Sequence, residues 1–101
     1  MRMILTVTFP HESFNARVKD GTAGPTLEAI LADQKPEAVY FTEQGGKRAV
    51  ILVIEMSDPS RVPSFAEPWF LGFSADCEFR IVMSPEELAS AGLAELGEKW
   101  A

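Results

Sequence analysis

Residues 38–56 read AVYFTEQGGKRAVILVIEM, and this stretch decides the fold. Two runs rich in β-branched and aromatic residues, 38–43 and 48–56, flank a short segment at 44–47. The two glycines of that segment can adopt the positive φ angles of a tight turn. The pattern predicts a β-hairpin, and its second strand is apolar on both faces, which is typical of a strand covered on both sides.

Two further strands are predicted, at residues 3–9 and 77–83, from the same kind of composition. Between the first strand and the hairpin the apolar period becomes helical, with two turns over residues 12–19 and a second helix that begins near Pro25. Proline suits that place because it lacks a backbone N–H, and the N–H groups in the first turn of a helix have no partner within the helix. The Lys-Pro pair at residues 35–36 is expected to end this helix, because the residue before a proline disfavours the helical conformation.

A helix is also predicted after the hairpin, over residues 59–69, with Asp58 as its N-cap. Pro68 is expected to bend or end this helix, because proline removes a helical hydrogen bond. The bulky residues at its end are expected to form one aromatic cluster. They are Trp69, Phe70, Leu71 and Phe73.

The last helix is predicted from a capping box. Ser84 and Glu87 stand three residues apart, and Pro85 occupies the first helical position between them. The helix is expected to continue toward Trp100, although two glycines within it lower its helical propensity.

The order of the elements is therefore β-α-β-β-α-β, followed by a C-terminal helix. This is the order of the ferredoxin-like, or split βαβ, arrangement in the α+β class. It predicts a four-stranded antiparallel sheet with two helices on one face. The length favours a single domain over residues 1–101.

Composition argues against several classes of function. Fifteen acidic residues against nine basic ones give a net charge of −6, which disfavours a nucleic-acid partner. One cysteine and one histidine, without CxxC or HxxxH spacing, predict no metal site and no cofactor. The longest apolar run, residues 49–54, is too short to cross a bilayer. The lone Cys77 and the lack of a recognisable signal peptide predict a cytoplasmic protein.

A sheet with helices on one side leaves its other face uncovered. If the apolar side of the first strand packs on the helices, Ile4, Thr6 and Thr8 lie on the uncovered face. The strand at 48–56 adds one of two apolar sets, either Val50, Leu52, Ile54 and Met56 or Ala49, Ile51 and Val53. The last strand adds Glu78, Arg80 and Val82.

Large apolar patches rarely stay exposed on soluble monomers, and free strand edges invite pairing. We therefore expect a homodimer. Facing sheets and edge-to-edge pairing both satisfy the sequence.

Three stretches carry a resemblance to known proteins: KPEAVYF at 35–41, AEPWF at 66–70 and MSPEEL at 83–88. They are similar to a small uncharacterised bacterial family within the dimeric α+β barrel superfamily, and the element order and half-apolar sheet face resemble the superfamily as a whole. The superfamily includes muconolactone-isomerase-like, YCII-like and antibiotic-biosynthesis-monooxygenase-like proteins. The resemblance implies a dimeric barrel. It transfers no residue roles, and no motif ties an aspartate to His11 as in the His–Asp pair of YCII-like proteins.

Three side chains are candidates for catalysis. His11 follows the first strand and has a side chain suited to general acid–base work near neutral pH. Arg80 can bind a carboxylate through a bidentate fork, and Tyr40 can polarise a carbonyl oxygen. The simpler interpretation of each is a solvated or paired surface residue.

A ligand held between sheet and helices, or between two sheets, would contact a wider set of residues. That set is Thr6, Thr8, Tyr40, Glu55, Trp69, Glu78 and Arg80. Three functions remain open: a dimeric protein that binds a small, partly apolar ligand, a cofactor-free isomerase or monooxygenase-like enzyme, and a subunit that docks another protein.

Overall fold

The computed structural model describes all of residues 1–101. Its four strands are β1 (Arg2–Thr8), β2 (Ala38–Gln44), β3 (Lys47–Glu55) and β4 (Asp76–Ile81). They form one antiparallel sheet in the order β2-β3-β1-β4. The sheet order and the order of elements confirm the predicted α+β, ferredoxin-like arrangement.

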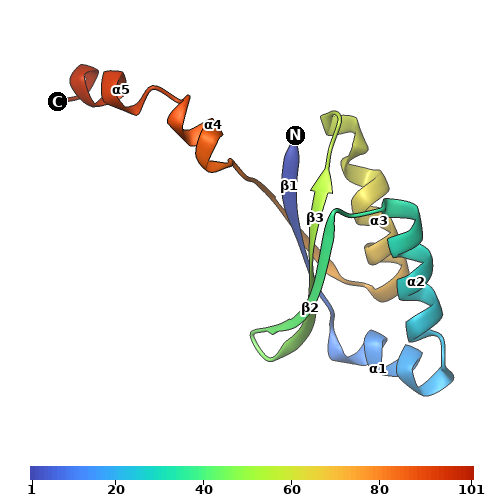
Figure 1. Cartoon of the computed structure of the whole chain (residues 1–101). Helices are drawn as coiled ribbons and strands as arrows, with labels where there is room; N and C mark the ends of the chain where they lie inside the picture. The colour runs from blue at the N-terminus through green and yellow to red at the C-terminus, as the bar shows by residue number, and fades with distance from the viewer.

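Three helices cover one face of the sheet (Figure 1). They are α1 (His11–Asp20), α2 (Ala23–Gln34) and α3 (Val62–Phe73), and a 3-10 turn, η1 (Pro59–Arg61), leads into α3. Asp58 caps that turn, as predicted, because its carboxylate accepts a hydrogen bond from the Ser60 N–H at 2.9 Å. Gly21 ends α1 with a φ of 80°, a conformation that glycine adopts without steric cost.

The hydrophobic core lies between the sheet and these helices. Leu5 is in register with Leu52 on one side and Phe79 on the other, so all three point toward the helices. This register resolves the choice left open for β3. Val50, Leu52 and Ile54 face the core, whereas Ala49, Ile51 and Val53 lie on the opposite face.

The helix does not end at Pro68, one of the two predicted outcomes, because α3 continues to Phe73. Proline at this position deprives only one carbonyl, that of Ser64, of its helical partner. Ser64 is exposed, so water can satisfy the carbonyl. Burial of Trp69 and Phe73 in the core then favours continuation of the helix.

The predicted aromatic cluster forms only in part. Trp69 and Phe73 are buried and pack against Phe9, with ring centroids 5.8 Å and 5.0 Å away. Phe70 and Leu71 belong to the exposed surface, and Leu71 is 82% exposed. Each helical residue is rotated by about 100° from the previous one, so four near-consecutive side chains cannot share one face.

The C-terminal segment, residues 82–101, forms an arm that extends away from the sheet (Figure 1). The capping box is confirmed, since Ser84 and Glu87 exchange both hydrogen bonds at the start of α4 (Pro85–Ala89). The single helix predicted here is instead two, because Gly92, with a φ of 75°, separates α4 from α5 (Leu93–Lys99). None of the helices in the chain combines the length and apolarity that crossing a membrane demands.

Candidate functional site

The bare face of the sheet is the face that no helix covers. Strand pairing places one transverse row across its middle, from Glu78 on β4 through Thr6 and Ile51 to Tyr40 on β2. A neighbouring row runs from Arg80 to Ala38 through Ile4 and Val53. The centre of the bare face is therefore apolar, and its two edges carry polar or charged side chains.

A hollow of about 460 Å³ lies at the hairpin end of the bare face. Six polar or small residues line it: Thr8, Gln44, Gly45, Lys47, Asp76 and Glu78. All but Gly45 of the turn occupy bare-face positions, because strand residues two apart point the same way. The hollow offers a hydroxyl, an amide, two carboxylates and an ammonium group as hydrogen-bonding partners.

The apolar centre lies next to this hollow. Ile4, Ile51 and Val53 are half-buried, although nothing in the chain packs over them. Thr6 is only 2% exposed, so its neighbours already enclose it. A molecule lying along the bare face would contact apolar side chains at the centre and polar ones at the hairpin end.

The three catalytic candidates lie in three separate places. Tyr40 and Arg80 belong to opposite edge strands, β2 and β4, whose backbones are three strand spacings, or about 14 Å, apart. His11 is exposed at the first position of α1. Within one chain, the structure therefore assembles no catalytic group from these residues.

Arg80 and Glu78 are neighbours on the bare face. Their charged groups are 4.0 Å apart, and both side chains are more than half exposed. An exposed pair at this distance contributes at most about 1 kcal/mol to stability. Both groups therefore remain accessible to another partner.

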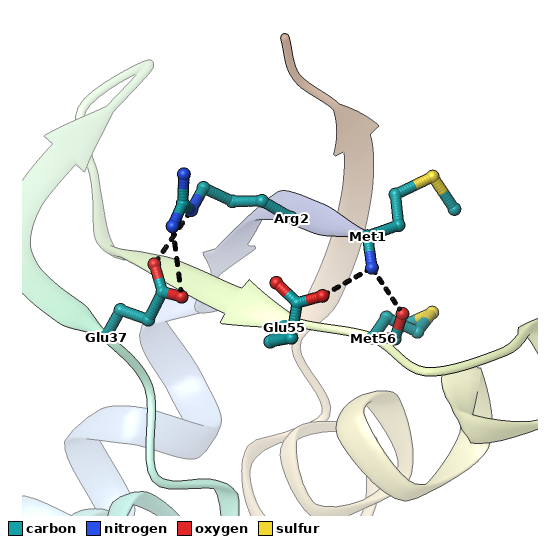
Figure 2. A network of polar contacts seen from close by, with 5 residues as sticks. All are labelled: Met1, Arg2, Glu37, Glu55 and Met56. Carbon is teal, nitrogen blue, oxygen red and sulfur yellow. Dashed lines mark hydrogen bonds and ion pairs between the residues drawn. The ribbon is translucent and has the colours of Figure 1, made fainter. Parts of the chain in front are cut away.

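Glu55 has a partner within the chain (Figure 2). Its carboxylate accepts a hydrogen bond from the Met1 ammonium group, which also donates to the Met56 carbonyl at 2.9 Å. In the same network, Arg2 Nε donates to Glu37 at 2.8 Å. The Glu37 carboxylate raises the pKa of Arg2. These contacts fasten the ends of β1 and β3, so the position of Glu55 indicates a structural role.

Trp69, the remaining predicted contact, lies on the helix side of the sheet. It is fully buried in the core, and its indole N–H donates to Gln34 Oε1 at 3.2 Å. The ligand residues proposed from the sequence are thus divided between the two sides of the sheet. Thr6, Thr8, Tyr40, Glu55, Glu78 and Arg80 occupy bare-face positions.

Cys77 faces the helices and packs against the core. Burial, with a smaller contribution from Asp76, raises the pKa of its thiol to about 12. The thiol is therefore a poor nucleophile at neutral pH. No three His, Cys, Asp or Glu side chains gather closely enough to hold a metal ion.

The sequence interpretation missed Lys47 and Asp76, which line the hollow. Both lie one residue outside the strands predicted from the apolar runs, at 48–56 and 77–83. The alternation of Asp76, Glu78 and Arg80 was the available signal, because residues two apart share a face of a strand.

The bare face thus combines an apolar centre, a polar hollow and two unpaired strand edges in one surface. No protein-family model matches the chain, and no curated protein matches it at a significant level.

Proposed function

We propose that the chain acts as a homodimer of the dimeric α+β barrel type, in which two bare faces enclose a small, partly apolar ligand. The observation that carries the proposal is the composition of the bare face. Its centre offers Ile4, Ile51 and Val53 to an apolar partner, although no element of the chain covers them. Burial of such a surface against an identical surface is a common solution for small soluble proteins.

The hollow at the hairpin end supports a ligand between the sheets. A volume of about 460 Å³ falls within the range of about 300–1,000 Å³ typical of small-molecule pockets. An opposing sheet would close the side that is now open to solvent. The ligand's polar end would lie among Thr8, Lys47, Asp76 and Glu78, and its apolar part would contact Ile51.

Facing sheets would also bring the two edges of the bare face together. Tyr40 and Arg80 lie on edge strands whose backbones are about 14 Å apart across one sheet. A two-fold axis along the strands would place β2 of one copy over β4 of the other. The polar groups of both edges would then surround one shared space.

A thermal-shift screen of the full chain tests ligand binding, with a panel of small hydroxy acids, amino alcohols and aromatic acids. A ligand at about 100 times its Kd stabilises a protein by about 2.7 kcal/mol, which raises the Tm of a domain this size by about 10 °C or more. We expect Thr8→Val and Glu78→Gln to weaken the shift. Glu86→Gln, a matched carboxylate change on the arm, should leave the shift unchanged.

Sedimentation tests the assembly. We expect a species of about 22 kDa at micromolar concentration for the wild-type chain of 11.1 kDa, and dissociation in Ile51→Asp. A stable 11.1 kDa species, or a dimer that Ile51→Asp leaves intact, would contradict the facing-sheet arrangement. The absence of any Tm shift that depends on Thr8 would contradict the ligand site.

A further inference from the structure

The arm, residues 82–101, is built from helices that are too short to persist alone. α4 has five residues and α5 has seven, whereas isolated helices below about 12 residues are marginal in water. The capping box at Ser84 supports only the first turn. Ordering of the arm therefore needs a surface to pack on, and the chain's own sheet and helices do not provide it, since the arm extends away from them (Figure 1).

The arm also carries apolar side chains that face solvent. Leu88 and Leu93 line a groove of about 490 Å³ between α4 and α5, together with Pro85 and Ala89. Leu96 and Trp100 follow on α5 and beyond it, and Trp100 is 76% exposed. Apolar side chains gathered in this way mark a docking surface rather than a solvated helix.

The surface area of the chain indicates how much contact is missing. Its accessible surface is 6709 Å², about 1,000 Å² more than the roughly 5,700 Å² expected for a compact protein of 11.1 kDa. Its radius of gyration is 17.1 Å, against about 13 Å for a compact chain of this length. If each of two chains buried its excess surface against the other, the dimer would bury roughly 2,000 Å² in total, which is the area of a stable, specific dimer.

We propose that the arm of each chain docks on a second copy of the same chain and that the two copies exchange arms. Arm exchange deepens the homodimer of the proposed function and rests on it. Reciprocal exchange satisfies the two-fold symmetry of a closed dimer, because each copy donates one arm and accepts one. It also supplies the packing that α4 and α5 need.

The edge strand β2 is the acceptor that fits the arm best. It carries two adjacent aromatic residues that remain largely exposed, Tyr40 at 66% and Phe41 at 59%. Its outer edge has no strand partner. Tyr40 lies on the bare face and Phe41 on the opposite one, so contact with the leucines of the arm on the bare-face side would cover the Tyr40 ring.

Charge complementarity favours the same acceptor. The arm holds four glutamates and one lysine: Glu86, Glu87, Glu95, Glu98 and Lys99. The hairpin that joins β2 to β3 contains Lys47 and Arg48, the only adjacent basic pair in the chain. Lys47 forms no ion pair within its own chain, so its ammonium group can approach the acidic arm of a second copy, whereas Arg48 donates a hydrogen bond to Asn15 Oδ1 at 2.8 Å on the helix side of the sheet. A net negative arm is unsuited to anionic membrane surfaces.

Sedimentation of full-length variants tests whether the arm holds the dimer together. Leu88→Asp/Leu93→Asp places two charges in the apolar groove, and we expect the dimer Kd to rise by about 100-fold or more. Ser90→Asp/Ala91→Asp adds the same charge to the bend between α4 and α5, and its Kd should stay near the wild-type value. Near-ultraviolet circular dichroism of the buried Trp69 reports whether the body of each variant remains folded.

A photo-crosslinking residue at position 93 identifies the acceptor. In a mixture of ¹⁴N- and ¹⁵N-labelled chains, arm exchange predicts crosslinks between an arm peptide of one label and a β2 peptide of the other label. Crosslinks within one chain only would overturn arm exchange, and crosslinks elsewhere on the other copy would overturn β2 as acceptor. A wild-type monomer would overturn arm exchange and the dimer together. If the Leu88→Asp/Leu93→Asp variant dimerised as tightly as wild type while the separate Ile51→Asp variant dissociated, arm exchange alone would be overturned.

Discussion

Gln34, the last residue of α2, is hydrogen-bonded to Trp69 within α3, 35 residues away in the sequence. The indole N–H of Trp69 donates to Gln34 Oε1 at 3.2 Å, and Gln34 Nε2 donates to the Phe65 carbonyl at 2.8 Å. Trp69 is fully buried, so its N–H has no access to water. The two hydrogen bonds fix the end of α2 against α3 over the core.

Replacement of Gln34 by leucine should destabilise the fold. The buried indole N–H would lose its acceptor, and an unsatisfied buried group of this kind costs about 1–3 kcal/mol. Urea unfolding measures the loss. Gln44→Leu, the same change at the exposed end of β2, should alter stability by no more than about 0.5 kcal/mol. Equal losses in both variants would contradict the role of the Gln34–Trp69 contact.

Two leucines provide a matched test of where the core lies. Leu5 is fully buried between the sheet and the helices, whereas Leu71 on α3 is 82% exposed. Leu5→Ala should cost about 2–5 kcal/mol because it leaves a cavity, and Leu71→Ala should cost about 0.5 kcal/mol or less. Chemical denaturation of both variants measures the difference. A large loss in Leu71→Ala would place that side chain in a contact that the monomer does not contain.

The fold was predictable because its signals are local and repeated. Alternation along the strands and the turn at Gly45 and Gly46 determine the hairpin, and the proline at residue 25 marks the start of a helix. Local signals were less decisive where tertiary packing outweighs local preference. Pro68 stays inside α3 because burial of Trp69 and Phe73 outweighs the loss of one hydrogen bond.

The candidate site was predictable only in outline. Period-2 alternation assigned Thr6, Thr8 and Glu78 to one face, and the structure places them there. The hollow depends on which strand ends lie side by side, and the sequence contains no signal for that pairing at the level of single residues. The break of the C-terminal helix at Gly92 and the direction of the arm also depend on backbone geometry that periodicity does not encode.

Cys77 should react slowly with iodoacetamide in the folded chain. Its thiol pKa is raised to about 12, chiefly by burial, so little thiolate exists at pH 8. We expect the folded rate to be roughly 100-fold below the rate in guanidinium chloride, where the thiol regains an ordinary pKa. Ser90→Cys in a Cys77→Ala chain, with its thiol on the exposed arm, should react at nearly the same rate under both conditions.

The same shift predicts a decline of stability in alkali. The unfolded chain releases the Cys77 proton near its ordinary pKa of about 8.5, whereas the folded chain keeps it until about pH 12. Stability should therefore fall as the pH rises through this window, and Cys77→Ala should remove that part of the decline. Identical alkaline unfolding curves for the two chains would contradict the burial of the thiol.

The capping box at the start of α4 should weaken in acid. The Ser84 N–H donates to the Glu87 carboxylate at 2.8 Å, and this hydrogen bond, with that of the Ser84 side chain, lowers the pKa of Glu87. A lowered carboxyl pKa means that the stabilisation is complete above the ordinary value of about 4.3 and is lost as the pH falls through the lowered one. The ¹³C shifts of residues 85–89 should therefore move toward coil values at low pH. Glu87→Gln keeps a hydrogen-bond acceptor that does not titrate, so the α4 signals of this variant should change little over the same pH range. If the variant instead lost helix in parallel with the wild type, Glu87 would be excluded as the titrating group.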